Sequence, residues 1–324
     1  MNEILIADKS GREVERKVVQ PQEVVIFEDK KEAIVNEETI LQHLQKAREL
    51  AKQMEVGQRE ATVNVEAKYP DLPIFIWLLC DAHYGSIHTD YEALIRDYQI
   101  VRDTPNFFVI SNGDEVDNFL ADMGKWSTGA YETPITPEQQ ALLIRSLFKK
   151  LDEQKKCLCF SFGNHNDWIK RGGLSFEGTW LRDFSCPVLN CGGLLRLRYG
   201  SQEYKIAITH RYWGSSKLNP TLMAKRYMEY EYPNADVFFL GHTHQAEYLC
   251  FRRDRETEYR WAIIGGTYKA DDEYAAKHGI GGRGQLGGFC LVLNPYKRDI
   301  FVMRNLEEAK EYFEVLREIK NTSR

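Results

Sequence analysis

The chain has 324 residues, of which 43% are hydrophobic and 28% are charged, a composition typical of a globular protein with one large domain or two smaller ones. Its net charge of −5 argues against a broad, non-specific grip on duplex nucleic acid, but leaves room for a nucleotide or a strand end held by local cations. No apolar run approaches the roughly 20 residues that cross a bilayer, and the N-terminus lacks the features of a secretory signal. We therefore expect a cytoplasmic protein without a membrane partner.

Residues 1–70 form a charge-rich N-terminal extension that contains one amphipathic helix. Apolar residues recur at three- and four-residue spacing from Ile40 to Met54, and the acidic pair Glu37-Glu38 favours the start of this helix. Its apolar face must dock on the main domain, on a second copy of the chain or on another protein. Docking on its own domain is the ordinary explanation.

From residue 71 onward, short apolar runs alternate with loops and helical patterns. These runs are nearly continuous in apolar residues, which is typical of strands that are buried on both faces. Within one run, Cys157 and Cys159 are expected to lie on the same face of a strand, because side chains alternate along it. The predicted strands are Leu72–Cys80, Asn106–Ser111, Cys157–Phe162, Tyr204–Thr209, Val237–Leu240, Arg260–Ile264, Phe289–Leu293 and Ile300–Met303.

Helices are predicted between these strands and at the C-terminus. One of them begins with Thr136 as N-cap and Pro137 at its first position, with Gln139 placed for a capping box. Strands that alternate with helices indicate an α/β protein whose sheets are covered by helices. We therefore divide the chain into an extension at 1–70, a main domain at 71–305 and a C-terminal helical segment at 306–324. The predicted helices are Tyr91–Arg102, Pro137–Gln154, Pro220–Tyr230 and Leu306–Lys320.

Five motifs with metal-binding side chains follow directly after predicted strands. Ligands of α/β proteins bind beyond the carboxyl ends of strands, where several loops can aim side chains at one point. Carboxylates, imidazoles and an amide oxygen suit Mn, Fe, Zn or Ni better than Ca. Each motif alone is compatible with an ordinary polar turn, but five in succession predict a metal site. The motifs are Asp81-Ala82-His83, Gly113-Asp114-Glu115-Val116-Asp117, Gly163-Asn164-His165, Thr209-His210 and Gly241-His242-Thr243-His244.

In this order and over about residues 72 to 305, the motifs resemble the calcineurin-like metallophosphoesterase superfamily. The resemblance implies two packed mixed β-sheets flanked by helices, in a four-layer sandwich, and an enzyme with two divalent metal ions. Manganese is the preferred metal, and iron, zinc and nickel are alternatives. Carried over position by position, one metal is held by Asp81, His83, Asp114 and His244, and the other by Asp114, Asn164, His210 and His242.

The resemblance also implies a mechanism in which a hydroxide bridging the two metals attacks the phosphate ester. His165 resembles the histidine that gives a proton to the leaving oxygen, and Asp117 the carboxylate that orients this histidine. Two positions depart from the family pattern. Asn166 follows His165 where many members have an acidic residue, and Asn118-Phe119 stand where protein phosphatases have Arg-Gly.

Aromatic and cationic residues near the motifs are candidates for binding the substrate. They favour a phosphodiesterase that acts on a nucleotide or, as a nuclease, on a nucleic acid end. A phosphomonoesterase acting on a small molecule or a phosphoprotein is the alternative enzyme. A binding scaffold of the same fold is less favoured, because every ligand position carries a competent side chain. We also consider a homo-oligomer formed through the N- or C-terminal helix. The substrate-binding candidates are Trp126, Arg211, Trp213 and Arg283.

Overall fold

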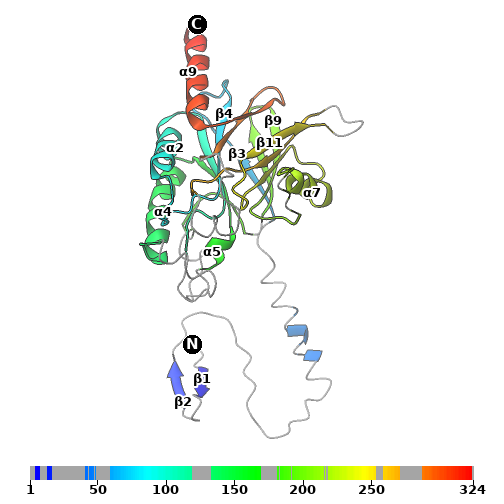
Figure 1. The fold of residues 1–324 in the computed structure, drawn as a ribbon. Coiled ribbons are helices and arrows are strands. Elements are labelled where there is room, and N and C mark those ends of the chain that lie inside the picture. Colours follow the sequence, from blue (N-terminus) through cyan, green and yellow to red (C-terminus); the bar gives the residue numbers. More distant parts are fainter. Residues whose placement is uncertain are drawn as a thin grey trace. The chain divides into compact units, whose positions relative to one another are not determined.

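The computed structural model divides the chain into two units, Met1–Glu55 and Val56–Arg324. In the first unit, β1 (Ile4–Ala7) pairs antiparallel with β2 (Glu13–Arg16) (Figure 1). Residues 41–42, 44–46 and 48 are helical and lie within the helix predicted from Ile40 to Met54. The domain boundaries and the docking of this helix remain predictions. The structure describes residues 4–7, 13–16, 41–42, 44–46, 48, 59–118, 133–168, 181, 183–190, 192–214, 216, 218–252, 258–270 and 287–322.

The second unit contains two mixed sheets of six strands each. In the first sheet, with the order β14-β13-β4-β5-β6-β7, the strands from β4 to β7 run parallel, and β13 lies antiparallel to β4. In the second sheet, with the order β11-β12-β10-β9-β8-β3, the central strands β9, β10 and β12 run parallel. The bounds of the first sheet are β4 (Ile74–Leu79), β5 (Phe107–Asn112), β6 (Cys157–Ser161), β7 (Val188–Leu189), β13 (Phe289–Leu293) and β14 (Ile300–Met303). Those of the second are β3 (Glu60–Asn64), β8 (Gly193–Tyr199), β9 (Gln202–Thr209), β10 (Val237–Leu240), β11 (Glu247–Phe251) and β12 (Arg260–Ile264).

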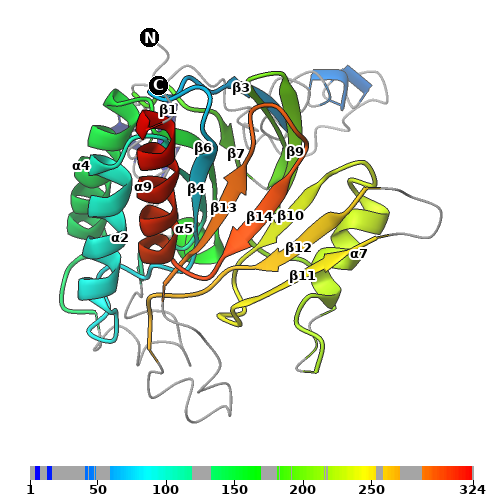
Figure 2. The ribbon, with the colours of Figure 1, turned by 90° about the horizontal axis from the view of Figure 1, so that it is seen from above.

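Helices cover the outer face of each sheet, which gives four layers (Figure 2). The first sheet carries α2 (Tyr91–Asp103), α4 (Pro137–Glu153) and α9 (Leu306–Thr322), whereas α7 (Leu222–Tyr230) packs on the second. The short α5 (Asn164–Trp168) follows β6. The capping box predicted for α4 is present, since the Gln139 amide donates to the Thr136 side chain and the Thr136 amide to the Gln139 side chain. The architecture confirms the predicted α/β fold with two mixed sheets flanked by helices.

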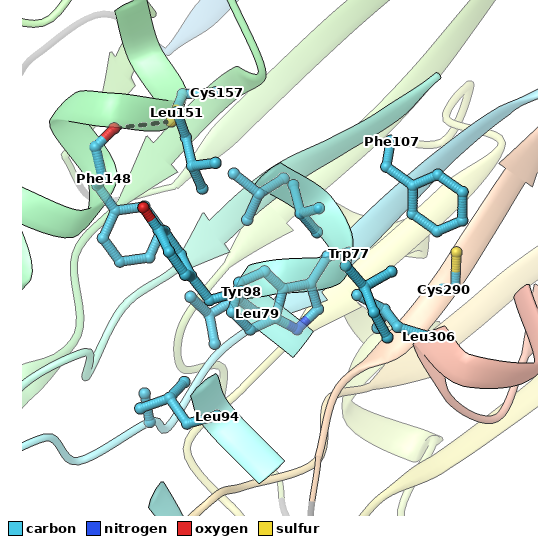
Figure 3. Packing of buried hydrophobic residues seen from close by; sticks show 14 of the residues in the cluster. Trp77, Leu79, Leu94, Tyr98, Phe107, Phe148, Leu151, Cys157, Cys290 and Leu306 are labelled. Atoms are coloured by element: carbon cyan, nitrogen blue, oxygen red, sulfur yellow. Dashed lines mark hydrogen bonds between the residues drawn. The ribbon is translucent and has the colours of Figure 1, made fainter. Parts of the chain in front are cut away.

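Three hydrophobic clusters fill the spaces between these layers, because successive side chains of a strand point to opposite faces. On β4, Phe75, Trp77 and Leu79 pack against the helices, whereas Ile74 and Ile76 pack between the two sheets. Figure 3 shows part of the helix-facing cluster, in which side chains of α2, α4 and α9 meet those of the first sheet. The third cluster joins the second sheet to α7. The inter-sheet cluster therefore ties the two sheets to each other.

Every predicted strand and helix in the described part of the main domain is present, and the sheets also contain strands that were not predicted, β3, β7, β8 and β11. Among the missed strands is β8, in which Arg196 and Arg198 interrupt the apolar run. One expectation was wrong, since Cys157 belongs to the helix-facing cluster and Cys159 to the inter-sheet cluster. A bulge in the β5–β6 register inserts Leu158 as an extra residue, which turns the two thiols to opposite faces.

No described helix has both the length and the apolar character of a membrane span. The C-terminal helix α9 buries Leu306, Ala309 and Phe313 against the first sheet. Its other side leaves Val315 and Ile319 exposed. An oligomer contact through α9 remains a prediction.

Candidate metal centre

The predicted motifs lie at the carboxyl ends of parallel strands in both sheets, and their side chains meet. Asp81 and His83 follow β4 of the first sheet, whereas His244 follows β10 of the second. The Nε2 atoms of His83 and His244 are 3.1 Å apart, and His244 Nε2 lies 3.2 Å from Asp81 Oδ1. We call this group, Asp81, His83 and His244, the His83 half of the centre.

A second group combines residues that follow β5, β9 and β10. His210 Nε2 lies 2.9 Å from Asp114 Oδ2, and His242 joins them within metal-ligand spacing. The other ring nitrogen of His210 lies 2.6 Å from the main-chain oxygen of Asn112, which fixes the orientation of the ring. We call Asp114, His210 and His242 the His210 half. The structure thus brings Asp81, His83 and His244 together in one group and Asp114, His210 and His242 in another, while the shared role of Asp114 and the part of Asn164 remain predictions.

The charge states of the two carboxylates and of His83 and His242 suit cation binding, whereas His210 must lose a proton to bind a metal. Burial lowers the pKa of His83 and of His242 to about 4, so both imidazoles are uncharged at neutral pH. Burial acts to raise the pKa of the Asp81 and Asp114 carboxyls, but the neighbouring histidines outweigh it and hold both well below their usual range. For His210, Asp114 and Asp81 overcome burial and raise the pKa to about 10. Ionised carboxylates and neutral imidazoles are the forms that bind metals.

Three buried polar atoms of the motif residues, each of a kind that binds metals, lack a hydrogen-bond partner. They are Asp81 Oδ1, Asn164 Oδ1 and His210 Nε2, the last of which lies close to Asp114 without hydrogen-bond geometry. Leaving such an atom unpaired costs about 1–3 kcal/mol. A divalent cation in each half would serve as the partner of all three, and the mixed carboxylate, imidazole and amide set fits borderline transition metals. The residues present therefore fit a binuclear divalent metal centre.

The main chain around the centre is held in an uncommon conformation. Non-glycine residues with positive φ cost of order 1–3 kcal/mol each and persist only where the surroundings impose them. Gly163 is required for a different reason, since a Cβ there would lie 2.1 Å from Asp114 Oδ1. The residues of the motifs with positive φ are Asp81 (50°), His83 (48°), Asp114 (54°), Asn118 (48°), His242 (72°) and His244 (55°).

Comparison with protein families agrees with this geometry. The model of the family described as Calcineurin-like phosphoesterase matches residues 76–246, more than half of the chain. The chain belongs to this family. The family is one of metal-dependent phosphoesterases, and the buried His/Asp clusters of the present member fit that chemistry.

Solved structures share the fold of this phosphoesterase at low sequence identity. A putative 5'-nucleotidase from Staphylococcus aureus is 14% identical, with 71% of this chain and 53% of that chain covered and a TM-score of 0.41. A metallophosphoesterase from Sphaerobacter thermophilus is 15% identical, with coverages of 71% and 87% and a TM-score of 0.33. A single mutant of Vps29 from Entamoeba histolytica is 10% identical, with coverages of 71% and 97% and a TM-score of 0.37.

This phosphoesterase thus spans about half the length of the first of these structures. A search among curated proteins finds no match to the sequence.

The Asp117 carboxylate contacts His83 and also lies near His165, the histidine that the resemblance assigns to it. Its Oδ1 lies 2.9 Å from His83 Nδ1 and 3.0 Å from Lys269 Nζ, and its Oδ2 accepts from Thr133 Oγ1 at 2.8 Å. His165 Nδ1 instead lies 2.5 Å from the main-chain oxygen of Asp117. The rings of His83 and His165 are 4.5 Å apart, so His165 stands beside the metal-ligand candidates.

Asn166 joins the two loops that carry Asp114 and Asn164, which explains an amide at this position. Its Oδ1 accepts from the amides of Asp114 and Gly163 at 2.7 and 2.8 Å, and its Nδ2 donates to Glu115 Oε2 at 2.8 Å. Glu115 is fully buried, and burial raises its pKa. An acidic residue at 166 would lack the donor that Glu115 needs.

The substrate-binding candidates divide into two groups. Arg211 and Trp213 follow His210 directly and are exposed, whereas Trp126 and Arg283 lie outside the described residues.

Sequence analysis missed two residues, Lys269 and Gln140. The Oε1 atom of Gln140 accepts from the amides of Asp117 and Asn118 at 3.0 and 3.1 Å. The only sequence signal for Lys269 was its place shortly after a predicted strand, because a lone lysine has no motif.

Proposed function

We propose that this chain is a two-metal phosphodiesterase that acts on a nucleotide or a nucleic acid end. The observation that carries the proposal is the exposed aromatic and cationic surface that directly follows His210. A nucleotide offers both a phosphate and a base, which suits a surface of this composition.

Arg211 supplies the cation of this surface. Its side chain is exposed, and its charge adds to burial and to His210 in lowering the pKa of His242. The guanidinium is therefore within electrostatic reach of the His210 half. A guanidinium there suits a phosphate oxygen that points away from the metals.

Trp213 supplies an aromatic face that is held in place by its neighbours. The side chain is 57% exposed, and its ring lies 5.8 Å from the rings of Tyr212 and Tyr230. The guanidinium carbon of Arg226 lies 4.6 Å from the ring centroid. An exposed tryptophan fixed between such neighbours provides a platform for a base, and stacking on such a platform contributes about 1–3 kcal/mol per base.

The position of the phosphatase arginine further supports a diester substrate. Asn118 stands there, fully buried, and its Nδ2 donates to the main-chain oxygen of His165 at 3.1 Å. This side chain braces the His165 loop and offers no cation to a terminal phosphate. Recognition of a monoester dianion would lack the clamp that the protein phosphatases have at this place.

In the proposed reaction, the two bound cations would lower the pKa of water and neutralise charge on the phosphoryl oxygens. The contact of His165 Nδ1 with the Asp117 carbonyl orients the ring, to which we assign the exchange of a proton with the leaving oxygen. Burial lowers the pKa of His165, and the nearby Asp114 and Asp117 carboxylates partly offset this. A bound phosphate anion adds negative charge that favours the protonated ring.

The test compares bis-p-nitrophenyl phosphate with p-nitrophenyl phosphate, with and without Mn²⁺, together with short single-stranded oligonucleotides labelled at either end. We expect Mn²⁺-dependent diester cleavage. Trp213→Ala should raise KM for oligonucleotides about 5- to 150-fold and leave the small diester unchanged, since only the oligonucleotide offers a base to stack. Arg211→Ala should raise KM for both diesters.

The matched controls are Tyr259→Ala and Arg252→Ala. These residues form another exposed arginine–aromatic pair, 5.9 Å apart, in the second sheet, and their substitution should change neither KM. Faster hydrolysis of the monoester than of the diester would replace the proposal with a phosphomonoesterase. No turnover of either ester and no bound metal would favour the binding scaffold.

A further inference from the structure

Lys269 is a buried lysine next to the His83 half, and neither the motifs nor the proposed reaction accounts for it. Its side chain is 7% exposed and follows β12 of the second sheet. Its ammonium lies 3.0 Å from Asp117 Oδ1, and the same oxygen lies 2.9 Å from His83 Nδ1. A continuous chain of contacts therefore runs from Lys269 through Asp117 to His83, whose other nitrogen faces His244.

The main chain around Lys269 is fixed to the loop that carries Asp81 and His83. The carbonyl of Asp81 accepts from the Thr267 hydroxyl at 2.9 Å and from the Tyr268 amide at 3.1 Å. The Lys269 amide donates to Thr267 Oγ1 at 3.0 Å, and the Ala270 amide donates to the His88 carbonyl at 2.9 Å. Segment 267–270 thus lies along the first motif.

The side chain of Tyr268 anchors the same segment to the core. It is completely buried, and its hydroxyl donates to Asp97 Oδ2 at 2.5 Å. The hydroxyl oxygen of Tyr268 accepts from Trp77 Nε1 at 2.9 Å and from the Gly288 amide at 3.0 Å. With Tyr268 held in this way, Lys269 has little freedom to leave Asp117.

Stability of the fold does not account for this lysine. Taking an ammonium and a carboxylate out of water costs about as much as their attraction returns, so a buried ion pair is a weak source of stability. The His210 half, by contrast, uses a main-chain carbonyl of β5 at the equivalent ring nitrogen. A carboxylate partner can rotate or take up other contacts, and it needs a second group to fix it.

We propose that Lys269 is a positioning residue for the cation held by the His83 half. It fixes the Asp117 carboxylate so that this group accepts the proton of His83 Nδ1 and leaves the Nε2 lone pair for the metal. Lys269 contacts neither the metal nor the substrate in this role. The inference rests on the two-cation centre of the proposed function and is independent of the diester substrate.

The test is calorimetric titration of Mn²⁺ into the full chain after chelator treatment, comparing the unmodified protein with Lys269→Met. We expect two Mn²⁺ sites in the unmodified protein. In the variant, one affinity should fall about 10- to 100-fold, as is typical for loss of such a supporting partner, while the other is unchanged. Lys156→Met is the matched control, since Lys156 is a partly buried lysine bonded to main-chain carbonyls at the end of α2.

A double-mutant cycle assigns the weakened site. Lys269→Met should have no further effect on Mn²⁺ affinity in a His83→Ala background and its full effect in a His242→Ala background. Equal weakening of both sites, no change at either, tighter binding, or a full effect in the His83→Ala background would overturn the proposal. If Lys269→Met shows no cooperative thermal transition, Lys269→Gln replaces it, and the same site-selective loss is required.

The test of Lys269 can fail or succeed separately from the test of the diester substrate. Two Mn²⁺ sites without cleavage of any diester would remove the substrate proposal and leave the cycle interpretable. Fewer than two Mn²⁺ sites in the unmodified protein would overturn the role of Lys269 together with the two-cation centre.

Discussion

The two halves of the centre use the same kinds of ligand but support them differently. His83 and His210 are both buried histidines that follow a strand, yet burial lowers the pKa of His83 to about 4, whereas Asp114 and Asp81 raise that of His210 to about 10. At Nδ1, His83 meets the Asp117 side chain, and His210 meets the main-chain oxygen of Asn112.

The orientation of His210 is set by the main chain, whereas that of His83 is set by side chains. The carbonyl that orients His210 belongs to β5 and is present whatever side chain stands at 112. The support of His83 depends on the side chains of Asp117 and Lys269, which follow strands of different sheets and which substitutions can remove. The His83 half should therefore be the more sensitive of the two to changes outside the motifs.

Asp114→Asn should have the largest effect, because the family resemblance assigns Asp114 to both metals. Its Oδ2 lies beside His210, and its Oδ1 accepts from the His165 amide at 2.8 Å. Loss of its charge should reduce Mn²⁺-dependent cleavage of bis-p-nitrophenyl phosphate by at least about 10³-fold. Elemental analysis of the purified variant should show less than full metal occupancy. The control is Asp236→Asn, a buried carboxylate paired with Arg298 away from the centre, and equal losses in both variants would refute the bridging role.

Asp117→Asn should weaken the His83 half and leave the His210 half unchanged. The amide keeps an acceptor for His83 but presents a neutral group to the Lys269 ammonium, so the ring loses its fixed partner. Mn²⁺ affinity at one site should fall about 10- to 100-fold with the other unchanged, measured by calorimetric titration. Substitution of Asn112 by Ala tests the other half and should leave the partner of His210 in place. A loss of Mn²⁺ affinity from the Asn112 variant larger than that from Asp117→Asn would reverse the comparison.

Asn166→Asp tests the connection between the two motif loops of the first sheet. The change removes the donor to Glu115 and places a second acid beside it, which should destabilise the fold by about 1–3 kcal/mol. Thermal unfolding with and without Mn²⁺ provides the measurement. Glu115→Gln in the same chain restores a donor and should recover most of the loss, whereas additive losses in the double variant would show that the two side chains do not act together.

Lys156→Met gives the smallest effect and contrasts a lysine of the fold with the lysine of the centre. Lys156 Nζ donates to the carbonyls of Val101, Arg102 and Thr104, and burial lowers its pKa to about 8. Between this value and the ordinary pKa near 10.4, the unfolded chain holds more protons than the native one. The burial penalty is therefore full below pH 8 and disappears as the pH rises to about 10.4.

The stability of the unmodified protein relative to Lys156→Met should thus increase from pH 8 to pH 10.4. We expect a gain of about 1 kcal/mol, after allowing for the partial exposure of the ammonium. Urea unfolding at both pH values provides the measurement. If the stability of the unmodified protein relative to Lys156→Met stays constant or decreases over this pH range, the three carbonyls, rather than burial, dominate the environment of the ammonium.

Apolar runs and the motifs that follow them were sufficient to predict the fold and six of the side chains that meet at the strand ends. Strands such as β4 and β10 are buried along their whole length, so a continuous apolar run identifies them. In β8, one face carries Arg196 and Arg198, so the run is broken and the strand was missed. The bulge at Leu158 was equally invisible, because an extra residue in a pairing register leaves no mark on one strand alone.

The support of the centre was the least predictable part. Asp117 was expected beside His165, and its carboxylate lies near both His165 and His83, but only the geometry shows its contact with His83 Nδ1. Lys269 reaches Asp117 across 152 residues of sequence, through a segment held by main-chain bonds that residue types do not reveal. Side chains that bind a metal occur in motifs, whereas those that orient them are distributed over the chain.

The contact between His83 and His244 joins two sheets across 161 residues of sequence. A cation held by both would act as a removable cross-link, closing a long loop of chain in the manner of a disulfide. Loss of the cation would remove this link between the carboxyl ends of β4 and β10, although the core between the two sheets stays packed. Chelation should therefore also speed amide hydrogen exchange along β9 and β10, the strands that lead to the ligands, as well as in the motif loops.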